Sequence, residues 1–91
     1  MKVRLFATYR KLVGHRELDL PAPDTVLSLL ETISTTYGED MRTWLLSPDG
    51  RGKGENSIVL VNGRHIEHLD DVATTLSEDD IVSLFPLVAG G

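Results

Sequence analysis

Thr25-Val26-Leu27-Ser28-Leu29-Leu30-Glu31-Thr32-Ile33-Ser34-Thr35-Thr36-Tyr37-Gly38 is the segment that decides the fold of this chain. Its apolar residues recur at the spacing of one helical face: Val26, Leu29, Leu30, Ile33 and Tyr37. Asp24 or Thr25 is a suitable N-cap, and Gly38 is a suitable residue just after the last turn. We therefore predict an amphipathic helix over residues 26–37 that buries one face against the rest of the chain.

Two strands precede this helix. Residues 2–7 alternate with period two and place Val3, Leu5 and Ala7 on one face. Residues 16–20 alternate again, with Leu18 and Leu20 facing inward. Residues 8–14 are interpreted as a connection, so the two strands form a hairpin with a long link. Two prolines in residues 21–23 then end the second strand, because prolines interrupt a hydrogen-bonded ladder.

Three further strands follow the helix. Residues 39–46 fit either a short second helix or an irregular segment, and residues 47–56, with three glycines, predict a flexible loop. Strands are expected over 58–61 and 64–67, joined by Asn62-Gly63, the strongest two-residue hairpin signal. Residues 68–75 are read as irregular and 77–80 as a polar turn. The last strand covers 81–85 and stops at Pro86.

The order of elements predicts an α+β fold. One main helix between an early hairpin and three later strands suits a mixed sheet of about five strands wrapped on that helix, which is the β-grasp, or ubiquitin-like, arrangement. A chain of 91 residues suffices for a single core, so residues 1–91 are expected to form one domain. Residues 87–91 would form a flexible tail that ends in Gly90-Gly91.

Composition excludes several classes of function. The formal net charge of −5 argues against nucleic acid or an anionic membrane as the main partner. The chain has no cysteine, which excludes disulfides, thiolate nucleophiles and cysteine zinc sites. No signal peptide or membrane-length apolar run is evident, and we expect a cytoplasmic protein. No metal site is expected either, because His65 and His68 would point to opposite faces of a strand.

Strand parity leaves one face of the sheet uncovered. If Val3, Leu5 and their counterparts in the later strands face the helix, other apolar side chains must project from the opposite side: Phe6, Ile58, Leu60 and Phe85. An uncovered apolar cluster of this kind is typical of an interface. Two alternatives are open. Residues 39–46 or the long loop could cover the cluster, or one strand could be displaced by a residue, which would flip its side chains.

The last five residues carry the only candidate chemistry. An isolated Gly-Gly end is more often a frayed terminus than a functional one. A terminal carboxylate nevertheless becomes a good acyl donor once it is adenylated, and glycine has no Cβ, so its backbone passes through narrow channels. Ordering such an arm in a partner costs about 1–2 kcal/mol per residue. Docking through Phe6, Leu60 and Phe85 could offset that cost.

The chain resembles the MoaD/ThiS family of ubiquitin-like sulfur carriers, and within it the small subunits of molybdopterin synthase. The matching segments are Val3-Arg4-Leu5-Phe6-Ala7, Leu12-Val13-Gly14, the helix from Thr25, the Asn62-Gly63 hairpin, and Leu84-Phe85-Pro86-Leu87-Val88-Ala89-Gly90-Gly91. Leu87 stands where the family often has a second proline, which we expect to leave a looser and more apolar tail root.

The resemblance implies a carrier that is itself no enzyme and holds no cofactor. A ubiquitin-activating-type enzyme would use ATP to adenylate Gly91, a sulfur donor would convert it to a thiocarboxylate, and the large subunit of molybdopterin synthase would receive the sulfur. Gly90 gives clearance, and the partner-binding residues would be Phe6, Leu60, Phe85, Pro86, Leu87 and Val88. Relatives deliver sulfur to thiazole (thiamine), cysteine or tRNA pathways, and some archaeal relatives are conjugated to protein lysines.

Overall fold

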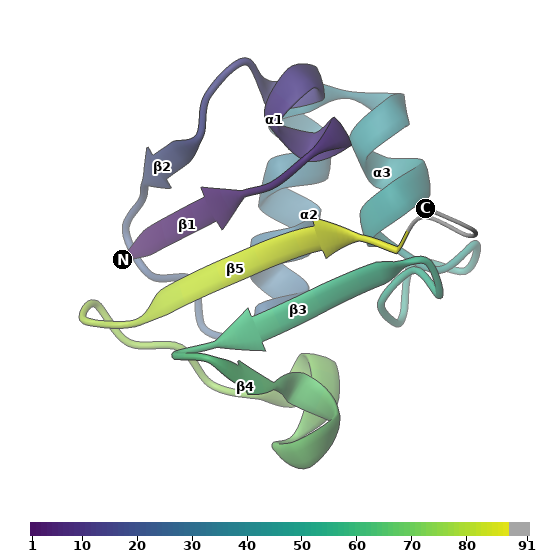
Figure 1. Cartoon of the computed structure of the whole chain (residues 1–91). Helices are drawn as coiled ribbons and strands as arrows, with labels where there is room; N and C mark the ends of the chain where they lie inside the picture. Colours follow the sequence, from purple (N-terminus) through teal and green to yellow (C-terminus); the bar gives the residue numbers. More distant parts are fainter. Residues whose placement is uncertain (88–91) are drawn as a thin grey trace.

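The computed structural model describes residues 1–87 and shows a five-stranded mixed sheet with helices on one face (Figure 1). The strands are β1 (Lys2–Leu5), β2 (Glu17–Asp19), β3 (Ser57–Val61), β4 (Arg64–His65) and β5 (Ile81–Pro86), in the spatial order β2-β1-β5-β3-β4. β5 runs parallel to β1 and antiparallel to β3. The predicted β-grasp fold is confirmed. The expected Gly-Gly tail lies outside the described residues.

The predicted main helix is present with the predicted bounds. α2 (Val26–Tyr37) begins after Thr25, whose hydroxyl oxygen accepts a hydrogen bond from the Ser28 N–H, and ends before Gly38. α3 (Glu39–Leu45) realises the helical alternative for the next segment and buries Met41 and Leu45. Both helices lie behind the sheet in Figure 1, so they leave its other face free.

One core joins the sheet to the helices. The inward side chains of the three central strands are at most 6% exposed: Val3, Leu5, Val59, Val61, Val82 and Leu84. They pack in one cluster with the apolar face of α2 and with Tyr9, Met41 and Ile66. The predicted strand parity is therefore correct on every one of these strands. Among the described residues, no helix is long and apolar enough to cross a membrane.

The segment predicted as a connection after the first strand contains a helix. β1 ends at Leu5, and Ala7, with a positive φ of 53°, turns the chain into α1 (Thr8–Val13). Tyr9 and Val13 lie four residues apart and are both buried, so α1 has one core-facing side. Gly14, at φ 85°, ends the helix.

The segment predicted as a flexible loop is folded against α3. The Gly54 N–H donates to the Leu45 oxygen (2.9 Å), and the Ser47 N–H donates to the Gly52 oxygen (2.8 Å). Asp49 accepts from the Ser47 hydroxyl and from the Arg51 N–H, and these bonds lower the pKa of its carboxyl group. The segment expected to be a flexible loop is therefore held by bonds within residues 47–52 and by one bond to α3, which its glycine content does not reveal.

The second hairpin follows its sequence signal, but its returning strand is short. Asn62 (φ 52°) and Gly63 (φ 81°) form the two-residue turn, and Val61 pairs with Arg64. β4 ends at His65, and a 3₁₀ turn, η1 (Ile66–His68), begins where the strand was expected to continue. A second such turn, η2 (Asp71–Ala73), follows within the irregular segment.

Gly54 provides a test of the packing between the loop and α3. A Cβ at this position would lie 2.1 Å from the Trp44 carbonyl oxygen, so Gly54→Ala must displace backbone. We expect it to lower the free energy of unfolding by about 1–3 kcal/mol in denaturant titrations. Gly52→Ala is the matched control, because its Cβ would meet only the Ser47 Oγ at 3.6 Å. Equal effects of the two substitutions would contradict this packing.

Candidate functional site

The root of the C-terminal tail, Pro86 and Leu87, continues β5, the central strand of the sheet. β5 pairs on both sides, with β1 and with β3, and its last residue, Pro86, lies opposite Ser57. The Leu87 N–H then donates to the Asn56 oxygen (2.7 Å), one step beyond the strand. The strand was predicted to stop at Phe85 and instead includes Pro86. The expectation of a looser root at Leu87 stays a prediction.

Proline fits at position 86 because of the alternation of the ladder. Successive N–H groups of a strand point to opposite sides. Because the Leu87 N–H points toward β3, the Pro86 nitrogen points toward β1. There β1 has already ended at Leu5, and the Phe6 oxygen accepts instead from the Tyr9 N–H (3.1 Å). No ladder bond is lost, and the strand includes Pro86. The Pro86 ring is buried, so any role in partner binding would be indirect.

The uncovered face of the sheet carries the predicted apolar cluster. Phe6, the residue after β1, stacks on Phe85 of β5, and Phe85 lies opposite Ile58 of β3. Leu60 lies one row further along β3. All four are half-buried. The rings of Phe6 and Phe85 stack with centroids 4.2 Å apart and an interplanar angle of 9°. The alternatives of a covering helix and a displaced strand are both excluded, because α3 and the loop pack elsewhere and the register is as predicted. We call these four residues the docking face.

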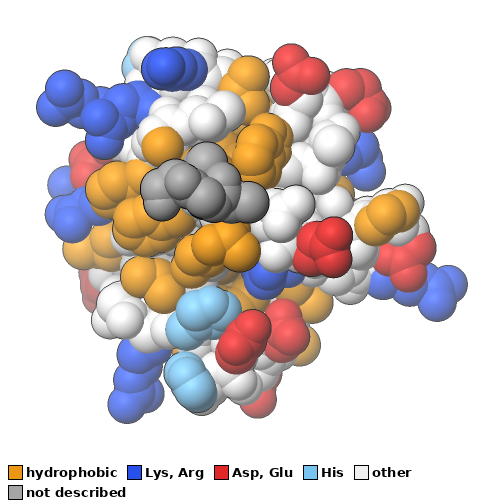
Figure 2. All heavy atoms as spheres, turned by 45° about the vertical axis from the view of Figure 1, so that its right-hand side comes forward, with side chains coloured by type: hydrophobic (Ala, Val, Ile, Leu, Met, Phe, Trp, Pro, Cys, Tyr) orange, Lys and Arg blue, Asp and Glu red, His pale blue; other side chains and the backbone are white. Residues whose placement is uncertain are grey.

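Arg10 and His65 border the docking face on two sides. Arg10 of α1 places its guanidinium carbon 5.9 Å from the centre of the Phe6 ring, within the range of a cation–π interaction. On the opposite side, His65 pairs with Leu60 across β3 and β4. Figure 2 shows hydrophobic side chains gathered on this side of the molecule, with basic side chains at one border and histidines at another. Among residues 1–87, Leu87 is the only large hydrophobic residue with an exposed side chain, at 52% exposure.

A buried polar contact lies beneath the tail root. The Tyr9 hydroxyl donates to the Ser57 Oγ (2.7 Å), and both residues are at most 2% exposed. The Tyr9 ring also meets the edge of Trp44, with centroids 5.6 Å apart. Burial raises the pKa of Tyr9 to about 12, while the hydrogen bond to Ser57 acts in the opposite direction. Sequence reasoning did not find this contact, since it joins residues 48 positions apart.

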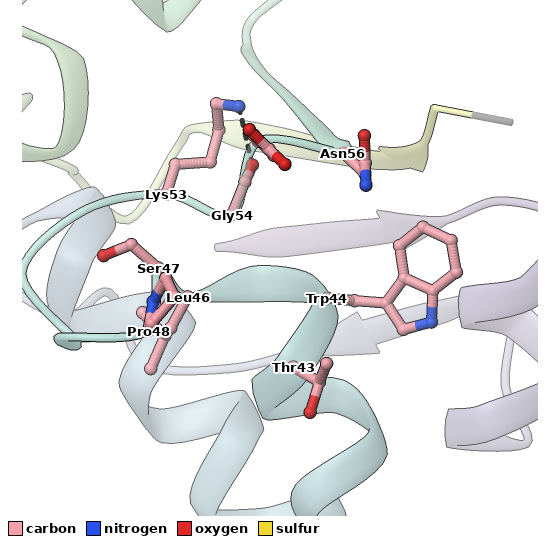
Figure 3. Close-up of a pocket in the computed structure, with 9 residues that line it drawn as sticks. Thr43, Trp44, Leu46, Ser47, Pro48, Lys53, Gly54 and Asn56 are labelled. Atoms are coloured by element: carbon pink, nitrogen blue, oxygen red, sulfur yellow. Dashed lines mark hydrogen bonds between the residues drawn. The ribbon is translucent and has the colours of Figure 1, made fainter. Parts of the chain in front are cut away.

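A cavity of about 630 Å³ lies between α3 and the folded loop (Figure 3). Trp44, Leu46 and Pro48 supply apolar walls, and Lys53 and Asn56 lie on the side of the tail root. The Lys53 ammonium group donates to the Gly54 oxygen (2.8 Å) and the Ser57 oxygen (2.6 Å). The lining also includes the acidic residue Glu55.

The two neighbouring histidines lie closer together than predicted. η1 turns back after His65, so the rings of His65 and His68 meet edge to face with centroids 6.3 Å apart. The expectation that they point to opposite faces was wrong, because it assumed that the strand continues. Within residues 1–87, no group of three or more metal-binding side chains occurs.

The sheet order and the helices packed on one face define the class of ubiquitin-like β-grasp proteins. The family model that matches the chain is that of the ThiS family, over residues 3–91. The chain belongs to the ThiS family.

Named relatives are similar over nearly their whole length. Small archaeal modifier protein 3 of Haloferax volcanii is 40% identical over 93 residues, covering 100% of this chain and 98% of the relative. A putative sulfur carrier protein of Archaeoglobus fulgidus is 35% identical over 91 residues, with the same coverage. The solved structure of a putative molybdopterin converting factor, subunit 1, of Pyrococcus furiosus has a TM-score of 0.70 and 30% identity, covering 96% of this chain and 95% of that one.

The predicted site residues thus fall into two groups. Phe6, Leu60 and Phe85 share one face, and Leu87 extends from the end of β5. Val88, Gly90 and Gly91 lie outside the described residues. Ile58 was also predicted on this face. Arg10 was not, because it carried no signal until α1 positioned it beside Phe6.

Phe85→Arg tests the docking face. The charge would remove the stack with Phe6 and place a cation in the centre of the face. We expect binding to the native activating enzyme to weaken about 30-fold or more by calorimetry, as for an interface hot spot. The circular dichroism spectrum should stay that of the folded protein. Thr36→Arg, on the exposed side of α2, is the control. Unchanged affinity would show that Phe85 does not serve docking. An unfolded Phe85→Arg variant would show that Phe85 belongs to the core.

We expect the raised pKa of Tyr9 to make the protein less stable at high pH. Its folded pKa, about 12, lies above the ordinary value of 10.0, so the unfolded chain loses this proton first as pH rises. The stabilisation is complete below about pH 10 and declines by about 2–3 kcal/mol by about pH 12. Denaturant unfolding at about pH 9 and about pH 11.5 measures this decline. Tyr9→Phe should lack this contribution, and an equal decline in both proteins would contradict the assignment.

Proposed function

We propose that this chain is a sulfur carrier whose C-terminal glycine, Gly91, is adenylated and then converted to a thiocarboxylate. Membership of the ThiS family and the similarity to a named sulfur carrier support the proposal. The observation that carries it is the position of the tail root. Leu87 leaves the end of β5 two residues after Phe85, so one partner can bind the docking face and receive the tail at the same time.

The chemistry needs only the terminal carboxylate from this chain. A carboxylate oxygen of Gly91 attacks the α-phosphorus of ATP, which forms the acyl adenylate and releases pyrophosphate. A sulfur nucleophile then attacks the acyl carbon, and AMP leaves with the original oxygen. A ubiquitin-activating-type partner holds the ATP, so the carrier is a cosubstrate that needs no bound cofactor and catalyses no step. We assign the reaction to the cytoplasm, where ATP is abundant.

The docking face supplies the binding energy for this step. Complete burial of an apolar side chain contributes about 1.5–3 kcal/mol, and the four half-buried residues each have part of that still to gain. Ordering residues 88–91 in a channel costs about 1–2 kcal/mol per residue, and the two terms are of similar size. A partner that combines an apolar patch with an acidic group opposite Arg10 would fit both the face and its border.

The proposed acceptor of the sulfur is the large subunit of molybdopterin synthase. The likeness to the putative molybdopterin converting factor subunit supports this acceptor, as does the Phe85-Pro86 ending. A second candidate is conjugation of the chain to protein lysines, and the 40% identity to a small archaeal modifier protein favours it. Both functions share the adenylated Gly91 and differ only in whether a sulfur or an amine attacks it. Thiamine, cysteine and tRNA pathways are the other sulfur acceptors.

Intact-mass analysis tests the carrier function. The chain is incubated with its native activating enzyme, ATP and hydrosulfide, and we expect a mass increase equal to exchange of one carboxylate oxygen for sulfur. A variant lacking Gly91 is the control and should keep its mass. Failure of the wild-type chain to exchange an oxygen would overturn the proposal and leave a binding module with an inert tail.

A pull-down from the native host separates the two candidate functions. Lysine conjugates that disappear when Gly91 is deleted identify a modifier. If no conjugates form and the deletion strain instead lacks molybdopterin, the chain is a dedicated carrier for that cofactor. A strain with normal molybdopterin and no conjugates would exclude both acceptors and direct attention to the thiamine, cysteine and tRNA pathways.

A further inference from the structure

Ser57 lies directly behind the tail root and faces the core. It is the first residue of β3 and the register partner of Pro86, the last residue of β5. The preceding residue, Asn56, provides the carbonyl oxygen that accepts from the Leu87 N–H. Any shift of the backbone at residues 56 and 57 therefore moves the last hydrogen-bonded amide before the tail.

Two side chains fix Ser57 from separate elements. Tyr9 reaches it from α1 and donates to its Oγ at 2.7 Å. Lys53 reaches it from the folded loop and donates to its backbone oxygen at 2.6 Å. The same ammonium group donates to the Gly54 oxygen at 2.8 Å (Figure 3). The two bonds from Lys53 close the end of the loop into a turn. Ser57 is thus held through its side chain and its main chain.

Packing alone does not require this polar arrangement. A buried hydroxyl pair adds no apolar contact, and each partner must be satisfied by the other to avoid a desolvation cost. Ser34 shows the ordinary solution in the same protein: it is equally buried, and its hydroxyl bonds to the Leu30 oxygen of its own helix at 2.7 Å. Ser57 instead depends on Tyr9, 48 positions away, and the Tyr9 N–H in turn donates to the oxygen of Phe6 of the docking face.

We propose that Ser57, held by Tyr9 and Lys53, is a positioning residue that fixes where the tail leaves the sheet relative to the docking face. It acts through Asn56 and Leu87 and does not itself touch the reacting carboxylate. The inference rests on the proposed carrier function.

The reach of the tail makes this position matter. Four residues beyond Leu87 extend at most about 13–14 Å, so the tail root limits which points Gly91 can reach once the face is docked. A displacement of about 1 Å in the placement of a reacting group can lower a rate about 100-fold. Loss of the Ser57 contacts should therefore lower the rate of adenylation more than the affinity for the activating enzyme.

Ser57→Ala and Lys53→Met test the positioning role in two independent measurements, with Ser34→Ala and Lys11→Met as matched controls. In the free protein, the Leu87 amide should exchange with solvent at least about tenfold faster in the test variants and at the wild-type rate in the controls. With the native activating enzyme and ATP, kcat for adenylation should fall about tenfold or more while KM stays within about twofold, because the docking face is intact.

The two measurements separate the possible failures. A wild-type chain that is never adenylated removes the carrier function, and the exchange rates then decide the structural claim alone. If the wild type reacts but Ser57→Ala matches Ser34→Ala in kcat, the positioning role is overturned. A rise in KM with unchanged kcat would also overturn it, because that result assigns Ser57 to docking.

Discussion

The pairing of β5 between β1 and β3 is the constraint on which the rest of the structure depends. Because β5 is the last element of the described chain and also a central strand, the C-terminus leaves from the interior of the sheet. The same pairing brings Phe6, Phe85 and Ile58 into one row and buries Leu84 against the helices on the other face. The same backbone hydrogen bonds thus stabilise the fold, assemble the docking face and hold the tail root.

Much of this could be predicted because it depends on local periodicity. The spacing of Leu29, Leu30 and Ile33 gave α2 its bounds, and Asn62-Gly63 gave the second hairpin. Alternation in the strands placed Leu60 and Phe85 on the outer face, since a period of two leaves only two choices for each strand. The docking face followed as the apolar side chains that one layer of helices could not cover.

The remaining features depend on contacts between distant segments, which periodicity does not encode. The segment from Thr8 to Val13 is too short for its helical pattern to be distinguished from a connection until Tyr9 meets Ser57. The loop before β3 is glycine-rich as flexible loops are, but Gly54 serves there to allow close approach to Trp44. Pro86 stays within the strand because β1 ends before it, a fact of sheet topology. Family membership and the named relatives support the proposed role of the tail in sulfur transfer or conjugation.

The central claim is that the rigid part of the molecule extends through the tail root to Leu87, so that docking determines where the tail begins. Backbone ¹⁵N relaxation of the free protein tests this most directly. The account predicts an order parameter for the Leu87 amide of about 0.85, equal to those within β5, because its N–H is held by the Asn56 oxygen. A value below about 0.6 would contradict the account, because the tail would then begin before Leu87 and docking could not fix its direction.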